Sequence, residues 1–334
     1  MRKIVAATVV LAVLFVVACG GGDDDDQASP TATPGISGVV VTTELTLGPN
    51  RFAVGLIDGG TGALVLAADV SLSFLKVISA GQAQVRYQVD ATTVVMDRFY
   101  IDPATGEQTG SGQTSVFVAE AEFGEVGEWG VQITGAIDGA SFAPINLPFE
   151  VSDPESVLNV GDPAPRSRQA TISDVADVSE IDTMTPPDSM HDIAIEDAVT
   201  SGSPSVILFG TPAFCETLTC GPVLQSVVLP LHETYGDRAH FIHVEPFFIE
   251  EARNGRGFCA VPAYNINLAR AGVGEGPGPC PFLTEEELEA AGESWNLTIE
   301  PVVFVVDSEG NIAGKFEAVV SREEIEALLQ TMIP

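Results

Sequence analysis

Short alternating runs of apolar and polar residues fill the first half of the chain, from Ile36 to about Val151, and Gly, Asn and Asp separate them. Alternation with a period of two predicts half-buried β-strands, and no convincing helical periodicity interrupts it. The expected strands are residues 39–47, 52–57, 70–74, 84–89, 114–121 and 129–137. Strands at this spacing predict an antiparallel β-sandwich over residues 36–151, with Trp129 in its core.

The pattern changes after residues 152–165, whose prolines and acidic residues predict a linker. Residues 166–334 are expected to form an α/β domain with helices packed on a mixed sheet. Its expected elements are helices at 192–200 and 223–235, strands at 205–209, 240–244, 302–306 and 312–317, and a last helix ending at Met332. Ser321 and Glu324 form a capping box that begins this helix. The segment 250–296 is long for a connection. It is expected to be an insertion that either has a function or is held by a cross-link such as a disulfide.

The chain begins with Arg2, Lys3 and an apolar run at residues 4–17 that is too short for a comfortable membrane span. Small residues then precede Cys19, so residues 1–18 resemble a bacterial lipoprotein signal peptide. This resemblance implies that Cys19 is lipidated and anchors the chain to a membrane, on the extracytoplasmic face of the bacterial cell envelope. An ordinary signal peptide with an accidental cysteine is the alternative. Residues 19–35 are acidic and rich in Pro and Thr, which predicts a flexible tether.

The charge balance excludes one class of partner. The sequence has 14 Lys and Arg against 47 Asp and Glu, a formal net charge of -33. Such a chain repels phosphates, so we expect no nucleic acid partner. With Cys19 lipidated, four cysteines remain, in a compartment where disulfides persist.

Cys215 and Cys220 follow the buried strand at 205–209 directly and precede the helix expected at 223–235. A thiol at a helix N-terminus is favoured as thiolate, and a second cysteine can resolve a mixed disulfide. Five steps along a helix rise about 7.5 Å, beyond the usual disulfide Cα separation of about 4.4–6.8 Å. Residues 216–219 must therefore arch as a loop, with the helix starting around Cys220 and Pro222 in its first turn. Either sulfur could be the attacking one.

The local charge opposes thiolate formation, because no Lys, Arg or His occurs from Gly210 to Val228 and Glu216 is adjacent to Cys215. We therefore expect a pair that favours the disulfide more than strong oxidants do.

Cys259 and Cys280 lie toward the two sides of the insertion, and closing a loop of about 20 residues would stabilise the fold by roughly 3 kcal/mol. A structural disulfide is the first interpretation of this pair. Metal ligation is the weaker one, because no nearby histidine or second cysteine pair completes four ligands. No metal ligands are expected in the site.

Four motifs resemble the thioredoxin superfamily, in particular its extracytoplasmic lipoproteins with an N-terminal immunoglobulin-like domain. They are Val160-Gly-Asp-Pro-Ala-Pro165, Phe214-Cys215, Cys220-Gly-Pro222 and Ile299-Glu-Pro301. The resemblance implies an immunoglobulin-like type for the β-sandwich and a thioredoxin-like fold for the second domain. It also implies Cys215 and Cys220 as the reactive pair and a cis Pro301 beside them, with Phe214, Pro222 and Glu300 in support. The family uses two residues between its cysteines, whereas this chain has four.

The leading hypothesis is a membrane-tethered thiol–disulfide oxidoreductase that acts on protein thiols or disulfides outside the cytoplasm, without a cofactor. A second is peroxide reduction, since Pro212, Thr217 and Cys220 resemble a peroxiredoxin site, although the spacing is one residue too long and no matching downstream arginine follows. A third is a non-catalytic binding module or copper metallochaperone using the cysteines and a histidine from His232, His240 and His243. His240 and His243 face opposite sides of one strand, so at most one could point to the cysteines.

Overall fold

The computed structural model describes residues 35–153, 157–255, 257–271 and 283–333. The predicted signal peptide, Cys19, nearly all of the tether and Cys280 lie outside these residues, so the predictions about them are not tested. Within the described ranges, no helix is both long enough and apolar enough to cross a membrane.

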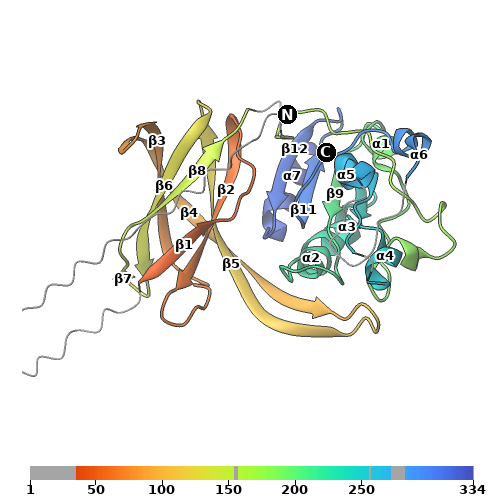
Figure 1. Ribbon diagram of the computed structural model, residues 1–334, viewed down its shortest axis with the longest axis horizontal. Coiled ribbons are helices and arrows are strands. Elements are labelled where there is room, and N and C mark those ends of the chain that lie inside the picture. The colour runs from red at the N-terminus through yellow and green to blue at the C-terminus, as the bar shows by residue number, and fades with distance from the viewer. Residues whose placement is uncertain (1–34, 154–156, 256, 272–282, 334) are drawn as a thin grey trace, which may run out of the picture. The chain divides into compact units, whose positions relative to one another are not determined.

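The first sheet is antiparallel throughout its eight strands, in the order β1-β2-β5-β4-β3-β6-β7 with β8 on β6 (Figure 1). Its strands are β1 Ile36–Val40, β2 Gly48–Asp58, β3 Asp69–Ser79, β4 Gln82–Ile101, β5 Gln108–Phe123, β6 Gly127–Ile137, β7 Ala140–Ser141 and β8 Ile145–Val151. Trp129 lies in a buried core with Phe52, Phe74 and Phe123. The antiparallel strand pairing is confirmed, whereas the β-sandwich of immunoglobulin-like type stays a prediction.

Two strand predictions need correction. The strand expected at 39–47 is wrong beyond Val40, because the chain leaves the sheet after β1. The N–H of Thr43 donates to the carboxylate of Glu317 at 2.8 Å, so a side chain satisfies the backbone there. The sequence also missed β8, which contains Pro148 and pairs with β6 alone. Proline is tolerated at such an edge because its missing N–H costs no ladder bond.

The second sheet has the order β10-β9-β11-β12. It comprises β9 Ser205–Phe209, β10 His240–Val244, β11 Val302–Val306 and β12 Ile312–Glu317, with the bounds that the sequence predicts. Strands β9 and β10 are parallel, and β11 is antiparallel to both β9 and β12. The predicted mixed sheet is thus confirmed. Strands β9 and β11 are buried along their whole length, which explains why their apolar runs were recognisable.

The helices lie mainly in the second half of the chain. They are the 3₁₀ turn η2 Val178–Glu180, α1 Ile195–Ala198, α2 Cys220–Pro222, the π-helix η3 Val223–Val228, α3 Leu229–Tyr235, α4 Ile249–Arg253, α5 Pro262–Ala271, α6 Glu285–Ala290 and α7 Arg322–Met332. Segments α2, η3 and α3 follow one another without a gap, so this helix begins at Cys220 as expected. The capping box at Ser321 is confirmed. The helix expected at 192–200 is shorter, because its N-cap residue Ala194 offers no side-chain acceptor.

The long β4–β5 hairpin reaches from the first sheet to the helix that begins at Cys220 (Figure 1). Phe99 on β4 packs so closely against Gly221 that a Cβ there would lie 2.5 Å from the ring. Val94 and Met96 on the same strand join the core around β9. Residues 34–334 form one compact unit, so the hairpin is an integral part of this core.

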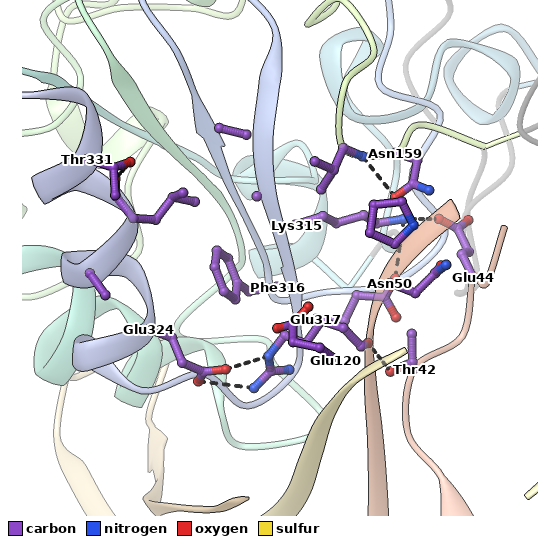
Figure 2. Close-up of a pocket in the computed structure, with 17 residues that line it drawn as sticks. Thr42, Glu44, Asn50, Glu120, Asn159, Lys315, Phe316, Glu317, Glu324 and Thr331 are labelled. Carbon is purple, nitrogen blue, oxygen red and sulfur yellow. Dashed lines mark hydrogen bonds and ion pairs between the residues drawn. The ribbon is translucent and has the colours of Figure 1, made fainter. Parts of the chain in front are cut away.

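Ion pairs line a cavity between β2 and β12 (Figure 2). Arg51 binds Glu324 at 2.7 Å, and Lys315 binds Glu44 at 2.6 Å. Glu317 accepts from Thr43 and lies 3.3 Å from Lys315. Apart from Glu120, the charged groups that line this cavity are therefore paired with one another.

Candidate functional site

Cys215 and Cys220 form a disulfide with a Cα–Cα distance of 6.0 Å. The four residues between them arch as the sequence predicts, and Leu218 turns the chain with a left-handed backbone at φ 60°. The loop thereby brings the two sulfurs together at the start of the helix, which a regular helix would not do.

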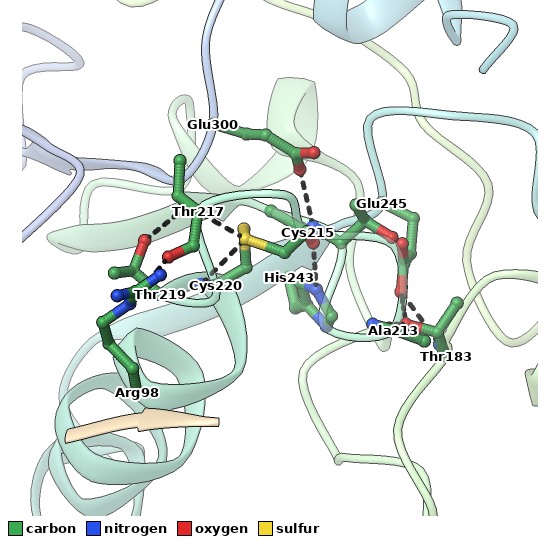
Figure 3. The surroundings of a disulfide bond; sticks show 12 residues. Arg98, Thr183, Ala213, Cys215, Thr217, Thr219, Cys220, His243, Glu245 and Glu300 are labelled. Carbon is green, nitrogen blue, oxygen red and sulfur yellow. Dashed lines mark hydrogen bonds between the residues drawn. A yellow bond between two sulfur atoms is a disulfide. The ribbon is translucent and has the colours of Figure 1, made fainter. Parts of the chain in front are cut away.

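Neutral donors surround the sulfur of Cys215 (Figure 3). The backbone N–H of Cys220, the first of the helix, donates to Cys215 Sγ at 3.2 Å. The hydroxyl of Thr217 lies 3.2 Å from the same sulfur, and the hydroxyl of Thr219 lies 2.7 Å from that of Thr217. A disulfide sulfur carries no hydrogen, so Thr217 donates to Cys215 and Thr219 donates to Thr217. We call Cys215, Thr217, Thr219 and Cys220 the sulfur site.

The two cysteines differ in access and in polar contacts. Cys215 is 6% exposed, whereas Cys220 is 0% exposed. The helix amide that could stabilise a thiolate points at Cys215, although Cys220 is the residue at the helix start. Both observations favour Cys215 as the attacking sulfur, a point that the sequence left open.

The Glu300–Pro301 peptide bond is cis. A Cβ added to Gly210 would lie 3.4 Å from Pro301 Cβ and 3.5 Å from Cys220 Cβ, so Gly210 lies between them. The backbone after β9, Pro301 and Cys220 therefore meet at one place. This is the neighbourhood that the resemblance predicts.

Two carboxyl groups lie behind the loop that leads to Cys215 (Figure 3). Glu300 accepts the N–H of Thr211 at 2.7 Å, and burial raises the pKa of Glu300 to about 8. Glu245 accepts both the N–H and the hydroxyl of Thr183, and burial raises the pKa of Glu245 as well. Thr183 in turn accepts the N–H of Ala213 at 3.1 Å. These contacts hold the loop before Cys215 in place. They also place two buried carboxyl groups with raised pKa values beside this loop.

One residue near the sulfur site was missed from the sequence. Arg98, on β4, donates through Nε to the carbonyl of Thr217 at 3.3 Å. It comes from the β4–β5 hairpin, far from Cys215 along the chain. The absence of cations between Gly210 and Val228 in the sequence thus gives an incomplete picture of the charge around the loop.

The histidines do not face the sulfurs. His243 has its Nδ1 2.7 Å from Asp188 Oδ2 and its Nε2 2.9 Å from the carbonyl oxygen of Gly210, so both ring nitrogens are occupied. His240 contacts Ser201, and His232 contacts Ser189. A copper site made from the two cysteines and one of these histidines is not formed by this arrangement.

The peroxiredoxin alternative is also disfavoured. Its proposed nucleophile Cys220 is fully buried, and the hydroxyl of Thr217 donates to Cys215 instead. Peroxide would have no exposed thiol to reach at Cys220.

The remaining predicted residues lie around the same helix and insertion. Phe214 packs edge-on against Phe258 at 5.9 Å, and Pro222 is buried in the first helical turn. Cys259 is 1% exposed and disulfide-bonded. Its predicted partner Cys280 lies outside the described residues, so that pairing stays a prediction.

Comparison with known proteins gives little further guidance. No protein-family model matches this sequence, and no curated protein matches it. Among solved structures, the chain is similar to a thiol:disulfide interchange protein, a thioredoxin family protein from Chlorobium tepidum TLS. The match has 17% identity and a TM-score of 0.28, and it covers 52% of this chain and 97% of the other. A TM-score this low does not establish a common fold or activity.

Proposed function

We propose that this chain is a thiol–disulfide oxidoreductase that exchanges disulfides with protein thiols or protein disulfides outside the cytoplasm. The observation that carries the proposal is the Cys215–Cys220 disulfide, with two neutral donors on Cys215 Sγ. Donors at that sulfur stabilise the thiolate that forms when the disulfide is reduced, and the thiolate is the attacking species.

The exchange takes two steps. In the reducing direction, the Cys215 thiolate attacks a substrate disulfide, a mixed disulfide forms, and one substrate sulfur leaves as a thiolate. Cys220, as thiolate, then attacks Cys215 Sγ, which releases the second substrate thiolate and restores the internal disulfide. The chain loses two electrons and the substrate gains them. Pro301 lies beside the sulfurs, where it supports the extended backbone of a bound substrate.

The membrane tether is part of the proposal. Cys19 carries the lipid, residues 19–35 hold the folded part off the membrane, and the sheet at residues 36–151 acts as an immunoglobulin-like spacer or docking domain before the thioredoxin-like domain at 166–334. Cys19→Ala moves the protein from the membrane fraction to the soluble fraction if the anchor exists. Unchanged membrane association would contradict it.

Trapping in the native envelope tests the chemistry. Cys220→Ser is expected to accumulate mixed disulfides with partner proteins, because the resolving sulfur is gone, whereas Cys215→Ser is expected to accumulate none. Non-reducing electrophoresis followed by mass spectrometry identifies the adducts, with Cys215→Ser/Cys220→Ser as the control. Adducts from Cys215→Ser alone would reverse the two roles. Adducts from neither single variant would leave a structural disulfide and end the oxidoreductase proposal.

A further inference from the structure

Four ionisable side chains that the thiol chemistry does not use lie close together beside the same loop. They are Asp182, Asp188, His191 and His243, which we call the histidine cluster. One ligand atom from each lies within 4.8 Å of those of the others. The side chains are buried, at 0% exposure for Asp182, 1% for Asp188 and 2% for His191. Buried carboxylates and imidazoles together are a ligand set for a transition-metal ion.

One atom of the cluster has no hydrogen-bond partner. His191 Nε2 is buried, and it lies 3.3 Å from Asp182 Oδ2 and 3.4 Å from Asp188 Oδ1 without a hydrogen-bonding geometry to either. An unsatisfied buried nitrogen is costly. Ligand bonds of about 2.0–2.2 Å in a tetrahedron put neighbouring ligand atoms roughly 3.3–3.5 Å apart. The spacing at His191 matches that value, and a metal ion would satisfy the nitrogen.

Backbone groups hold the carboxylates in place. Asp182 accepts the N–H of Met184 on one oxygen and that of Asp188 on the other, both at 2.7 Å. Asp188 Oδ1 accepts the N–H of Met190 at 2.8 Å. Partners of this kind orient metal ligands.

His243 donates one of its ring N–H groups to a backbone carbonyl. A carbonyl oxygen only accepts, so His243 Nε2 carries the proton that it donates to Gly210. The other nitrogen, Nδ1, lies 2.7 Å from Asp188 Oδ2, and a metal ion bound there would replace the proton between these two atoms. A ligating histidine commonly donates its second N–H to a backbone carbonyl in this way.

A cavity of about 160 Å³ is lined by two members of the cluster, His191 and His243, and by Glu245. A divalent ion with two carboxylates and two neutral imidazoles has no net charge, which suits a buried site.

We propose that Asp182, Asp188, His191 and His243 bind one zinc ion, or a similar first-row divalent metal ion, next to the loop that carries the disulfide. This site is separate from the cysteines, and it departs from the sequence-based expectation of no metal. It does not depend on the proposed oxidoreductase activity.

Metal titration of the oxidised full-length chain tests the site, because its Cys215–Cys220 disulfide presents no thiol there. After chelator treatment, one Co²⁺ per chain is expected to bind with the visible absorption of a four-coordinate site, and Zn²⁺ is expected to displace it. Elemental analysis gives the stoichiometry. Binding of no metal at equimolar concentration, or binding only after reduction of the disulfide, would overturn the proposal.

Two variants identify the ligands. His191→Gln is expected to weaken Co²⁺ binding by more than the roughly 10–100-fold that is lost when a group hydrogen-bonded to a metal ligand is removed. His240→Gln is the matched control, since His240 lies on β10 with His243 but contacts Ser201. Asp182→Asn is a second ligand variant, which keeps one oxygen for one of the two backbone amides and replaces the other oxygen by an NH2 group. Zn²⁺ should raise the unfolding temperature of the wild type and of His240→Gln, but not of Asp182→Asn or His191→Gln. An equal rise in all four would refute the assignment.

Discussion

The sulfur site and the histidine cluster both touch the loop after β9, but they are held in different ways. Cys220 Cβ packs near Gly210, and His243 binds the carbonyl of the same glycine. At the sulfur site, Cys215 Sγ is contacted by one amide and one hydroxyl, both neutral, and the cation Arg98 reaches only the carbonyl of Thr217. The histidine cluster consists of charged or chargeable groups, and each carboxylate has backbone donors as well.

The contacts at the sulfur site suit a group that reacts, whereas the contacts at the histidine cluster suit groups that stay in place. Neutral donors can adjust when a sulfur changes between disulfide and thiolate, and Cys215 retains some exposure. Burial alone would lower the pKa of His243, but the carboxylate of Asp188 raises it to about 10. Burial alone would raise the pKa of Asp188, but the charge of His243 holds it below its usual range. Without a bound metal ion, the charged form of Asp188 and the charged form of His243 therefore stabilise each other.

Removing one carboxylate from the histidine cluster should have the largest effect. Asp188→Ala leaves two imidazoles beside an empty position and is expected to cost about 3–5 kcal/mol of unfolding free energy. Removing the short disulfide with Cys215→Ala/Cys220→Ala is expected to cost only about 2 kcal/mol. Urea denaturation in the presence of chelator measures both. Asp237→Asn is the control, since the Asp237 side chain is 80% exposed. A smaller loss for Asp188→Ala than for the disulfide variant would reverse the comparison.

The sulfur site depends on the β4–β5 hairpin, whereas among the described residues no hydrogen bond of the histidine cluster involves this hairpin. Gly221→Ala places a methyl 2.5 Å from the Phe99 ring and is expected to destabilise the protein by about 1–3 kcal/mol. The same change inside an open helix would stabilise the protein by up to about 1 kcal/mol. The sign of the change in unfolding free energy therefore shows whether Phe99 packs on Gly221. Thermal unfolding gives the value.

Two further variants make that experiment specific. Gly110→Ala, on β5, meets open space and is expected to have little effect. Phe99→Leu combined with Gly221→Ala should recover part of the loss, because the smaller side chain makes room. A stabilised Gly221→Ala would show that the hairpin does not pack on the helix in solution.

Much of the second sheet and the sulfur site can be predicted from the sequence, because each is encoded by residues that are close together along the chain. Strands β9 and β11 are five-residue apolar runs, and Cys215 and Cys220 lie in one loop. The arch between the cysteines follows from helix geometry alone.

The histidine cluster and the hairpin are not local. His191 and the two aspartates lie in a segment without regular periodicity. His243 comes from β10, 55 residues after Asp188, far outside the window of about 11–18 residues over which hydrophobic periodicity is read. Val94 and Met96 look like surface-strand residues until β9 and its helix cover them. The length of β4 is therefore decided by tertiary packing.

A smaller effect is expected from the hydroxyl at the sulfur site. Thr217→Val keeps the shape of the side chain but removes the donor to Cys215 Sγ. A hydrogen bond to a charged group is worth about 1.5–3 kcal/mol, so the reduced protein should be alkylated at Cys215 roughly tenfold more slowly at neutral pH. Iodoacetamide labelling with mass spectrometry measures the rate. Thr105→Val, on an exposed turn, is the control. An unchanged rate would mean that the helix amide alone stabilises the thiolate.

A pH-dependent effect concerns Glu300, which links the two regions through Thr211 and the loop. Burial raises its pKa from 4.5 to about 8, so the folded protein binds a proton that the unfolded chain releases between these values. Stability from this group is complete below about pH 4.5 and is lost as the pH rises through 8.

Glu300→Gln carries no such proton, and its stability relative to wild type should increase from pH 5 to pH 9. Urea denaturation across this range measures the difference, with the exposed Glu309→Gln as the control. A parallel pH dependence for wild type and Glu300→Gln would mean that solvent screens this carboxyl group and that the slope belongs to the histidine cluster.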